Sequence, residues 1–414
     1  MTGTLAASRW LTALRPALSE LADVHWARLG QFEQALCGLQ AAYPVAAGLE
    51  AAVRSRRLRQ IRRGLARTGQ LALAVPARHG GGGHPPLLQV LLQFICGYHD
   101  VDLRDSSGLG HGRMIAEHAT APVRDRWLPA LLAGAVPGIA ITEPHGGSKV
   151  RATQTAAVPA GDGTWAVTGT KTWISRLTEA AVFCVFFTDP GGQLTAAAID
   201  AASPGLARRP ITPAGLSGWT WGELHLHAVT IRPADILGEP GQGMNVMREH
   251  FAHYRPLVTA TALGAAAGIH DHTAAQLTAR RQSGAIADLR DNALITLGRT
   301  YAQINAALLA ALTAYRLAQA GDPLAHLWGC AAKAHGTDIA YQAASELALL
   351  TGAAGFTADC RTAKARRDLN ALLYADGIHD SLYRSAGRSL TTPASDPLLT
   401  AARLAAAQAD LVHA

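Results

Sequence analysis

The spacing of apolar side chains divides the chain into three stretches. Up to about residue 136, and again from Met244, apolar residues recur every three to four positions, which predicts amphipathic helices. Between about 137 and 243 apolar and polar residues alternate between turn residues, which predicts short strands. We therefore expect an α+β fold with an N-terminal α-helical domain (1–136), a small antiparallel β-barrel or sandwich (137–243) and a C-terminal four-helix bundle (244–414).

Within this division, each periodic run predicts one element. The predicted N-terminal helices are Leu5 to Leu21, Val24 to Leu39, Leu49 to Thr68, Leu87 to Tyr98 and Val123 to Leu132. The predicted C-terminal helices cover 244–282, 288–320, 323–352 and 365–390. The clearest strand patterns are Trp165 to Val167, Ala181 to Phe187, Leu194 to Ile199 and Gly222 to Ile231.

Composition narrows the cellular setting. A chain of 414 residues is long enough for two or three domains with cores of their own. No apolar run reaches the length of a membrane span, and the N-terminus lacks a secretion signal. The five cysteines are scattered without a CxxC pair, which argues against a disulfide framework or structural zinc. These features predict a protein of the reducing cytoplasm.

The net charge of +7 suits a nucleic acid, an anionic lipid or an acidic protein partner. The densest basic run, Arg54 to Arg63, has apolar residues at helical spacing, so we interpret it as the solvated face of a surface helix. No nucleic-acid recognition motif accompanies it, and we expect no nucleic-acid binding. We also predict no metal site, because no HExxH-like frame accompanies the histidine pairs 225/227, 250/253 and 270/272.

The stretch from Ala140 to Ser175 carries the strongest candidate site. Proline and paired glycines in Thr142 to Ser148 favour a tight turn with exposed backbone donors. The strand pattern that follows places Trp173 beside hydroxyl residues. One interpretation is a β-hairpin that packs a core tryptophan. The other is a cradle for a flat heteroaromatic cofactor with hydrogen-bonding edges.

Several motifs occur in a characteristic order. They are TEPHGGS at 142–148, WIS at 173–175, FAHYRPLV at 251–258, RRQSG at 280–284, LTGAAGF at 350–356 and the RD pair at 367–368. Together they resemble the acyl-CoA dehydrogenase family over nearly the whole chain. The resemblance implies FAD as cofactor, held by Ile141, Thr142, Gly147, Ser148, Trp173, Ser175, Arg280, Ser283, Gly352 and Ala353.

Residue chemistry is consistent with these implied roles. Hydroxyls and backbone N–H groups can bond the flavin edge, and an indole such as Trp173 can cover one ring face. A guanidinium such as that of Arg280 suits a pyrophosphate through paired hydrogen bonds. The protein would orient the flavin, which carries the redox chemistry.

The catalytic base implied by the resemblance is Asp376. Family members mostly place a Glu-Gly pair about ten residues after the RD pair, where this chain has Asp376-Gly377. The aspartate is shorter by one methylene, about 1.5 Å, and burial would raise its pKa. The alternative is that Asp376 caps a helix starting near Ile378. His379 and Asp380 are secondary candidates for the base.

The substrate side departs further from the family. The resemblance implies that Phe251, Tyr254, Arg255 and Gly377 bind the substrate, but Ala252 stands where an aspartate often holds the pantetheine of CoA. The thioester could therefore be carried by CoA or by an acyl carrier protein, whose acidic surface would match the basic charge.

The leading hypothesis is an FAD-dependent acyl-thioester dehydrogenase. Dehydrogenation requires a base for the α-proton and a hydride acceptor for the β-carbon. Two alternatives stay open: a flavin monooxygenase on the same fold that uses reduced flavin and O2, and a flavin-binding or interaction protein that has lost catalysis. The family resemblance also implies a homodimer or homotetramer, and it leaves the electron acceptor unknown.

Overall fold

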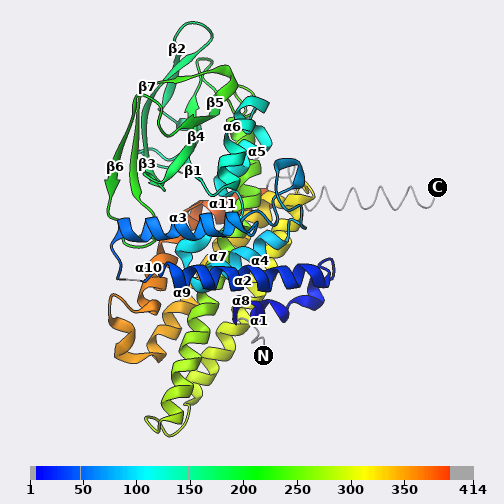
Figure 1. The fold of residues 1–414 in the computed structure, drawn as a ribbon, viewed down its shortest axis with the longest axis vertical. Helices are drawn as coiled ribbons and strands as arrows, with labels where there is room; N and C mark the ends of the chain where they lie inside the picture. The colour runs from blue at the N-terminus through cyan, green and yellow to red at the C-terminus, as the bar shows by residue number, and fades with distance from the viewer. Residues whose placement is uncertain (1–5, 47, 148–149, 392–414) are drawn as a thin grey trace, which may run out of the picture.

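A computed structural model describes residues 6–46, 48–147 and 150–391. Figure 1 shows a β-sheet at one end of the molecule and helices that extend from it to the other end. The predicted α+β class is confirmed. The N-terminal helices are α1 (Ala6–Thr12), α2 (Asp23–Ala42), α3 (Ala51–Arg67), α4 (Leu88–His99), α5 (Arg113–His118) and α6 (Ala121–Leu132).

Two expectations about the N-terminal helices are corrected. The predicted helix to Leu21 ends at Thr12, because Pro16 in the 3-10 turn Arg15–Ala17 cannot continue an α-helix. The basic helix α3 does not turn all its arginines to solvent. The guanidinium of Arg62 is buried and donates to four backbone carbonyls, including that of Ala135 at 3.3 Å. Buried guanidinium donors thus join α3 to the β-sheet side of the molecule.

The middle of the chain forms one seven-stranded sheet in the order β1-β4-β2-β3-β7-β6, with β5 paired to β4. The expected antiparallel pairing is wrong for β1, which lies parallel to β4. The chain passes through β2 and β3 between these two strands, which gives the long crossover that parallel pairing requires. The strands are β1 (Val136–Ala140), β2 (Ala156–Pro159), β3 (Trp165–Ser175), β4 (Ala180–Thr188), β5 (Leu194–Asp200), β6 (Leu206–Ile211) and β7 (Trp221–Ile231).

In the described part of the chain, five helices follow the sheet: α7 (Gly243–Gln282), α8 (Asp291–Gln319), α9 (Ala325–Leu350), α10 (Arg361–Leu372) and α11 (His379–Thr391). The predicted helix 365–390 is therefore two helices. The break contains Asp376 at φ 57° and Gly377 at φ 110°, and this left-handed backbone cannot continue a right-handed helix. None of the described helices combines the length and apolarity needed to span a bilayer.

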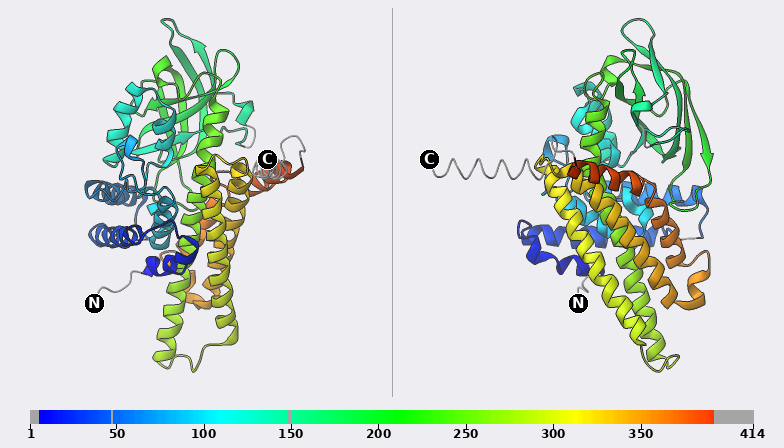
Figure 2. Two further views of the ribbon diagram at one scale, coloured as in Figure 1. Left: turned by 90° about the vertical axis from the view of Figure 1, so that its right-hand side faces the viewer. Right: turned by 180° about the vertical axis from the view of Figure 1, so that it is seen from behind.

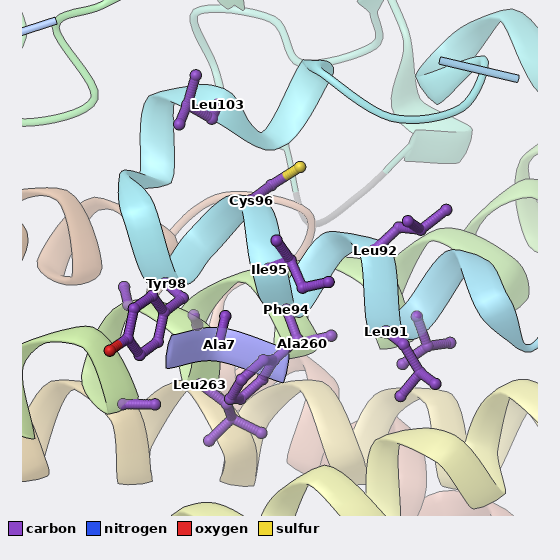
Figure 3. Packing of buried hydrophobic residues seen from close by; sticks show 14 of the residues in the cluster. Ala7, Leu91, Leu92, Phe94, Ile95, Cys96, Tyr98, Leu103, Ala260 and Leu263 are labelled. Carbon is purple, nitrogen blue, oxygen red and sulfur yellow. The ribbon is translucent and has the colours of Figure 1, made fainter. Parts of the chain in front are cut away.

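The largest core lies where α4 crosses α7. Every residue of α4 from Leu88 to Tyr98 is buried, and Figure 3 shows α4 side chains beside Ala260 and Leu263 of α7. A Cβ on Gly264 would lie 2.0 Å from the Phe94 carbonyl oxygen, so glycine is required for this close helix approach. The tight crossing fixes the position of the α7 segment that borders the candidate site.

Candidate active site and flavin cradle

A cavity lies beside the break between α10 and α11. Asp376 contributes to its wall from the break, and Tyr254 does so from α7. The structure thus brings together the predicted base and one predicted substrate residue, 122 positions apart in the sequence. The other lining residues come from α4, α7, α10 and the 3-10 helix η3 (Val101–Asp105): Gln93, Arg104, Leu257, Val258, Thr261 and Leu372.

The surroundings of Asp376 favour a carboxylate that can exchange a proton. Burial raises the pKa of Asp376 above its usual value, while nearby cations oppose that rise. Burial is the larger of these effects, so the carboxylate is a stronger base than a solvated aspartate. The opposing cations, in order of effect, are Lys333, Arg176, Arg104 and Arg255.

Arg255 and Phe251 form one unit beside the base. The Arg255 guanidinium lies 5.0 Å from the Phe251 ring centroid, in a cation–π contact. Its Nε donates to the backbone carbonyl oxygen of Asp376 at 3.2 Å, and its Nη1 lies 3.3 Å from the Cys330 Sγ. Arg255, which was predicted to bind substrate, therefore also holds the backbone of the base, and Phe251 packs against its guanidinium.

Tyr254 stacks against a buried histidine pair that includes His111, which sequence reasoning missed. His111 Nδ1 and His250 Nε2 lie 3.0 Å apart, and their rings lie 4.5 and 5.1 Å from that of Tyr254. Burial holds the pKa of both histidines well below 6.5, so the pair is neutral near pH 7. His111 gave no sequence signal, because it is a lone histidine whose partner lies 139 residues away.

The described residues contain one cluster with three groups of metal-ligand type: Asp100, Asp102 and Asp368. The ammonium of Lys364 lies among these carboxylates, at 2.6, 2.9 and 2.5 Å. The Lys364 ammonium thus lies where a metal ion would have to sit, and it offsets part of the charge of the three carboxylates. Asp368 also accepts a hydrogen bond of 2.6 Å from the Leu216 N–H. The RD pair thus joins α10 to the segment between β6 and β7.

On the sheet side, a buried ion pair holds the loop after β1. Glu143 accepts from the Lys171 ammonium at 2.8 Å and from the Gln154 and Thr155 N–H groups at 2.7 and 2.8 Å. Burial alone would raise the pKa of Glu143, but these hydrogen bonds lower it to about 2. Lys171 also donates to the Ile141 carbonyl at 3.1 Å.

The neighbouring cradle residues lie around this loop. The Thr142 carbonyl accepts from the Thr172 N–H at 2.8 Å, and a Cβ on Gly147 would lie 2.9 Å from the Thr142 Oγ1. The Ser175 hydroxyl accepts from Arg176 Nη1 at 2.6 Å. Ser148 lies outside the described residues.

Trp173 presents its indole to solvent. Its backbone has φ 59°, and the β3–β7 register shifts between Lys171 and Ile174. The side chain is 63% exposed, so it is not the core tryptophan of the hairpin interpretation. An exposed indole beside backbone polar groups fits a flat ring system that would cover it. The sheet side of the site is therefore compatible with a flavin.

The remaining predicted FAD residues lie elsewhere in the chain. Arg280 and Ser283 are exposed at the C-terminal end of α7, and Figures 1 and 2 place this end opposite the β-sheet. Gly352 and Ala353 begin the 3-10 helix η7 (Gly352–Phe356), which packs against α9 and α10. Within one chain, the end of α7 that carries Arg280 is therefore separated from the sheet that carries Trp173.

Comparisons with known proteins place this fold and site in a family. The family model for the acyl-CoA dehydrogenase middle domain matches residues 138–229, and the model for its C-terminal domain matches 241–391. A probable short/branched chain specific acyl-CoA dehydrogenase from Dictyostelium discoideum is 30% identical over 259 residues, which cover 61% of this chain and 62% of that protein. The chain belongs to the acyl-CoA dehydrogenase family.

Solved structures share the fold. An acyl-CoA dehydrogenase from Geobacillus kaustophilus has a TM-score of 0.79 at 21% identity, with 90% of this chain and 99% of that chain covered. The prolyl acyl carrier protein oxidase AnaB has a TM-score of 0.73 at 21% identity, with 88% and 99% covered. The matched part of the chain spans less than two thirds of the length of the D. discoideum relative. Members of the family are oxidoreductases that bind FAD, which confirms the predicted cofactor at the level of the family.

Proposed function

We propose that this protein dehydrogenates an acyl thioester with FAD and that Asp376 is the base. The observation that carries the proposal is the position of Asp376 in the cavity wall, where burial raises its pKa. FAD, when bound, supplies the acceptor for the hydride that leaves the β-carbon. Asp376 takes the α-proton, and the surrounding cations limit how basic the carboxylate becomes.

The cavity lining is mixed in polarity. Leu257, Val258 and Leu372 offer apolar contacts, whereas Gln93 and Arg104 bring an amide and a cation to the same cavity. The Gln93 amide already donates to the Arg104 carbonyl and accepts from Thr261 Oγ1, and the Arg104 guanidinium pairs with Asp102. The lining is therefore compatible with an apolar or a polar acyl group, and the proposal covers thioesters of both kinds.

Two thioester carriers fit the proposal. The curated D. discoideum relative is described as acting on acyl-CoA, whereas AnaB is described as acting on a prolyl acyl carrier protein. The net charge of +7 favours an acidic carrier protein, because opposite charge raises the rate of encounter. A carrier protein would lose affinity steeply with added salt, and CoA would lose less.

The separation of the predicted FAD-binding residues within one chain supports an oligomer. The end of α7 that carries Arg280 lies opposite the β-sheet that carries Trp173 (Figures 1 and 2), so we propose that a second copy supplies Arg280 and Gly352 to complete each FAD site. This proposal makes FAD affinity depend on protein concentration. Sedimentation at graded dilution, combined with FAD titration, tests it: affinity that stays constant while the oligomer dissociates contradicts a shared site.

Anaerobic spectroscopy tests the reaction. The FAD-loaded protein is mixed with saturated straight-chain, polar and amino-acyl thioesters, each on CoA and on an acyl carrier protein. We expect bleaching of the flavin by at least one of these saturated thioesters. Product formation that requires a flavin reductase and O2, without anaerobic bleaching, would indicate the monooxygenase instead. If added FAD gives no flavin spectrum, that result would indicate the third alternative, a protein that has lost flavin-dependent catalysis.

A further inference from the structure

The loop that carries Asp376 needs an external support. Asp376 adopts a left-handed backbone, which is unfavourable for a residue with a side chain. The loop also follows the C-terminus of α10, where the last backbone carbonyls have no partner inside the helix. Side chains from other elements must therefore hold its conformation.

Lys333 of α9 provides this support. Its Nζ donates to the Leu372 carbonyl at 2.8 Å and to the Gly377 carbonyl at 2.8 Å. The two carbonyls lie on either side of Asp376 in the chain, so one ammonium group bridges both ends of the loop. The Lys333 side chain is fully buried, which excludes competing water from these bonds.

We propose that Lys333 is a positioning residue for Asp376: it fixes the loop through the Leu372 and Gly377 carbonyls and places its cation beside the base. This inference rests on the proposed role of Asp376. Charge supports the geometry, because Lys333 is the cation with the largest effect on the pKa of Asp376, and it lowers that pKa. Burial lowers the pKa of Lys333 itself to about 8.

Other charged or titratable groups surround the loop, and substitution of Lys333 leaves these side chains in place. They are Arg104 of η3, Arg176 after β3, Tyr254 and Arg255 of α7, Asp338 of α9, and His379 and Asp380 of α11. One turn along α9, Thr337 Oγ1 lies 2.9 Å from His379 Nε2. Thr337 thus holds the start of α11 without placing a charge beside Asp376, which makes Thr337→Val a matched control.

The test combines Lys333→Met, which removes both charge and donors, with Lys333→Gln, which keeps an amide donor. For Lys333→Met we expect flavin reduction by an active thioester to slow by at least about tenfold, because a misplaced base loses rate steeply. We also expect the acidic limb of its pH profile to move to higher pH, since a stabilising cation is lost. Lys333→Gln should show the same movement of the limb with a smaller loss of rate, and Thr337→Val should keep the wild-type limb.

A second readout does not depend on turnover. Carbon-13 NMR of labelled aspartates, with Asp376→Asn to assign the signal, follows the Asp376 titration in FAD-free protein, and hydrogen exchange follows residues 373–379. Lys333→Met should raise the Asp376 pKa and speed this exchange; if that variant does not fold, Lys333→Gln carries the titration. An unchanged titration and unchanged exchange would overturn the inference. If no thioester bleaches the flavin of the wild-type protein, that result would instead count against the proposed function.

Discussion

The loop after β1 and the loop after α10 are two halves of one candidate site, but they are held in different ways. Glu143 finds its ammonium partner 28 residues along the chain, in a strand of the same sheet. The carbonyls of Asp376 and Gly377 are held by Arg255 and Lys333, which lie 121 and 44 residues away on α7 and α9. The cofactor side is thus secured within one sheet, whereas the base is placed by the packing of three helices. Substitutions that disturb the loop after β1 should lower stability or FAD affinity. Substitutions that disturb the loop after α10 should lower the rate of flavin reduction.

Replacement of the base should give the largest effect. In Asp376→Asn the amide cannot take the α-proton, so we expect the rate of flavin reduction to fall by roughly a thousandfold, within the range of general-base effects. FAD affinity should not change, because the sheet side is intact. Stopped-flow absorbance measures the rate, and FAD titration measures the affinity. Asp380→Asn, which removes the exposed secondary candidate four residues along, should keep the wild-type rate. Full activity in Asp376→Asn would assign the base elsewhere.

Removal of the sheet-side lysine should give the next largest effect. Lys171→Met leaves the Glu143 carboxylate without its buried partner, which we expect to lower the free energy of unfolding by about 3 kcal/mol. Urea denaturation measures this change. Arg209→Met breaks the exposed pair with Glu223 on the same sheet and should cost much less, because solvent screens this pair. Equal losses in the two variants would show that burial does not make the Lys171 pair special.

The sequence predicted some of this site and missed the rest for physical reasons. The change from helical to alternating spacing located the sheet, and Asp376-Gly377 stood at the place implied by the RD pair. The break at Asp376 was missed, because the apolar spacing of 365–390 continues across it and only the left-handed backbone ends the helix. Lys333 gave no signal, since its partners are carbonyls, which every residue carries. A contact of this kind exists only after the helices have packed.

A fall in pH should destabilise the fold in two steps, first through the histidine pair beside Tyr254 and then through Glu143. The pKa of His111 and of His250 lies well below 6.5 in the folded protein, so the unfolded chain binds more protons below that pH and stability falls. Glu143, with its pKa lowered from 4.5 to about 2, contributes stability that is lost as the pH falls through that interval. Urea denaturation from pH 8 to pH 2 should show the histidine step first and the Glu143 step at lower pH. His250→Gln should flatten the curve of unfolding free energy against pH between pH 7 and pH 5. An unaltered slope there would show that the histidine pair does not cause this loss of stability.

The smallest effect should come from replacement of Trp173. An exposed indole that covers one face of a ring contributes roughly 1 kcal/mol beyond area burial, so Trp173→Leu should weaken FAD binding by about fivefold. Val158→Ala removes another exposed apolar side chain from the same sheet and should leave the affinity unchanged. With FAD at saturation, the Trp173 variant should reduce its flavin at nearly the wild-type rate, because the base is held from α7 and α9. A rate loss as large as that of Asp376→Asn would mean that the two halves of the site are not independent, and that the indole helps to place the reacting carbon against Asp376.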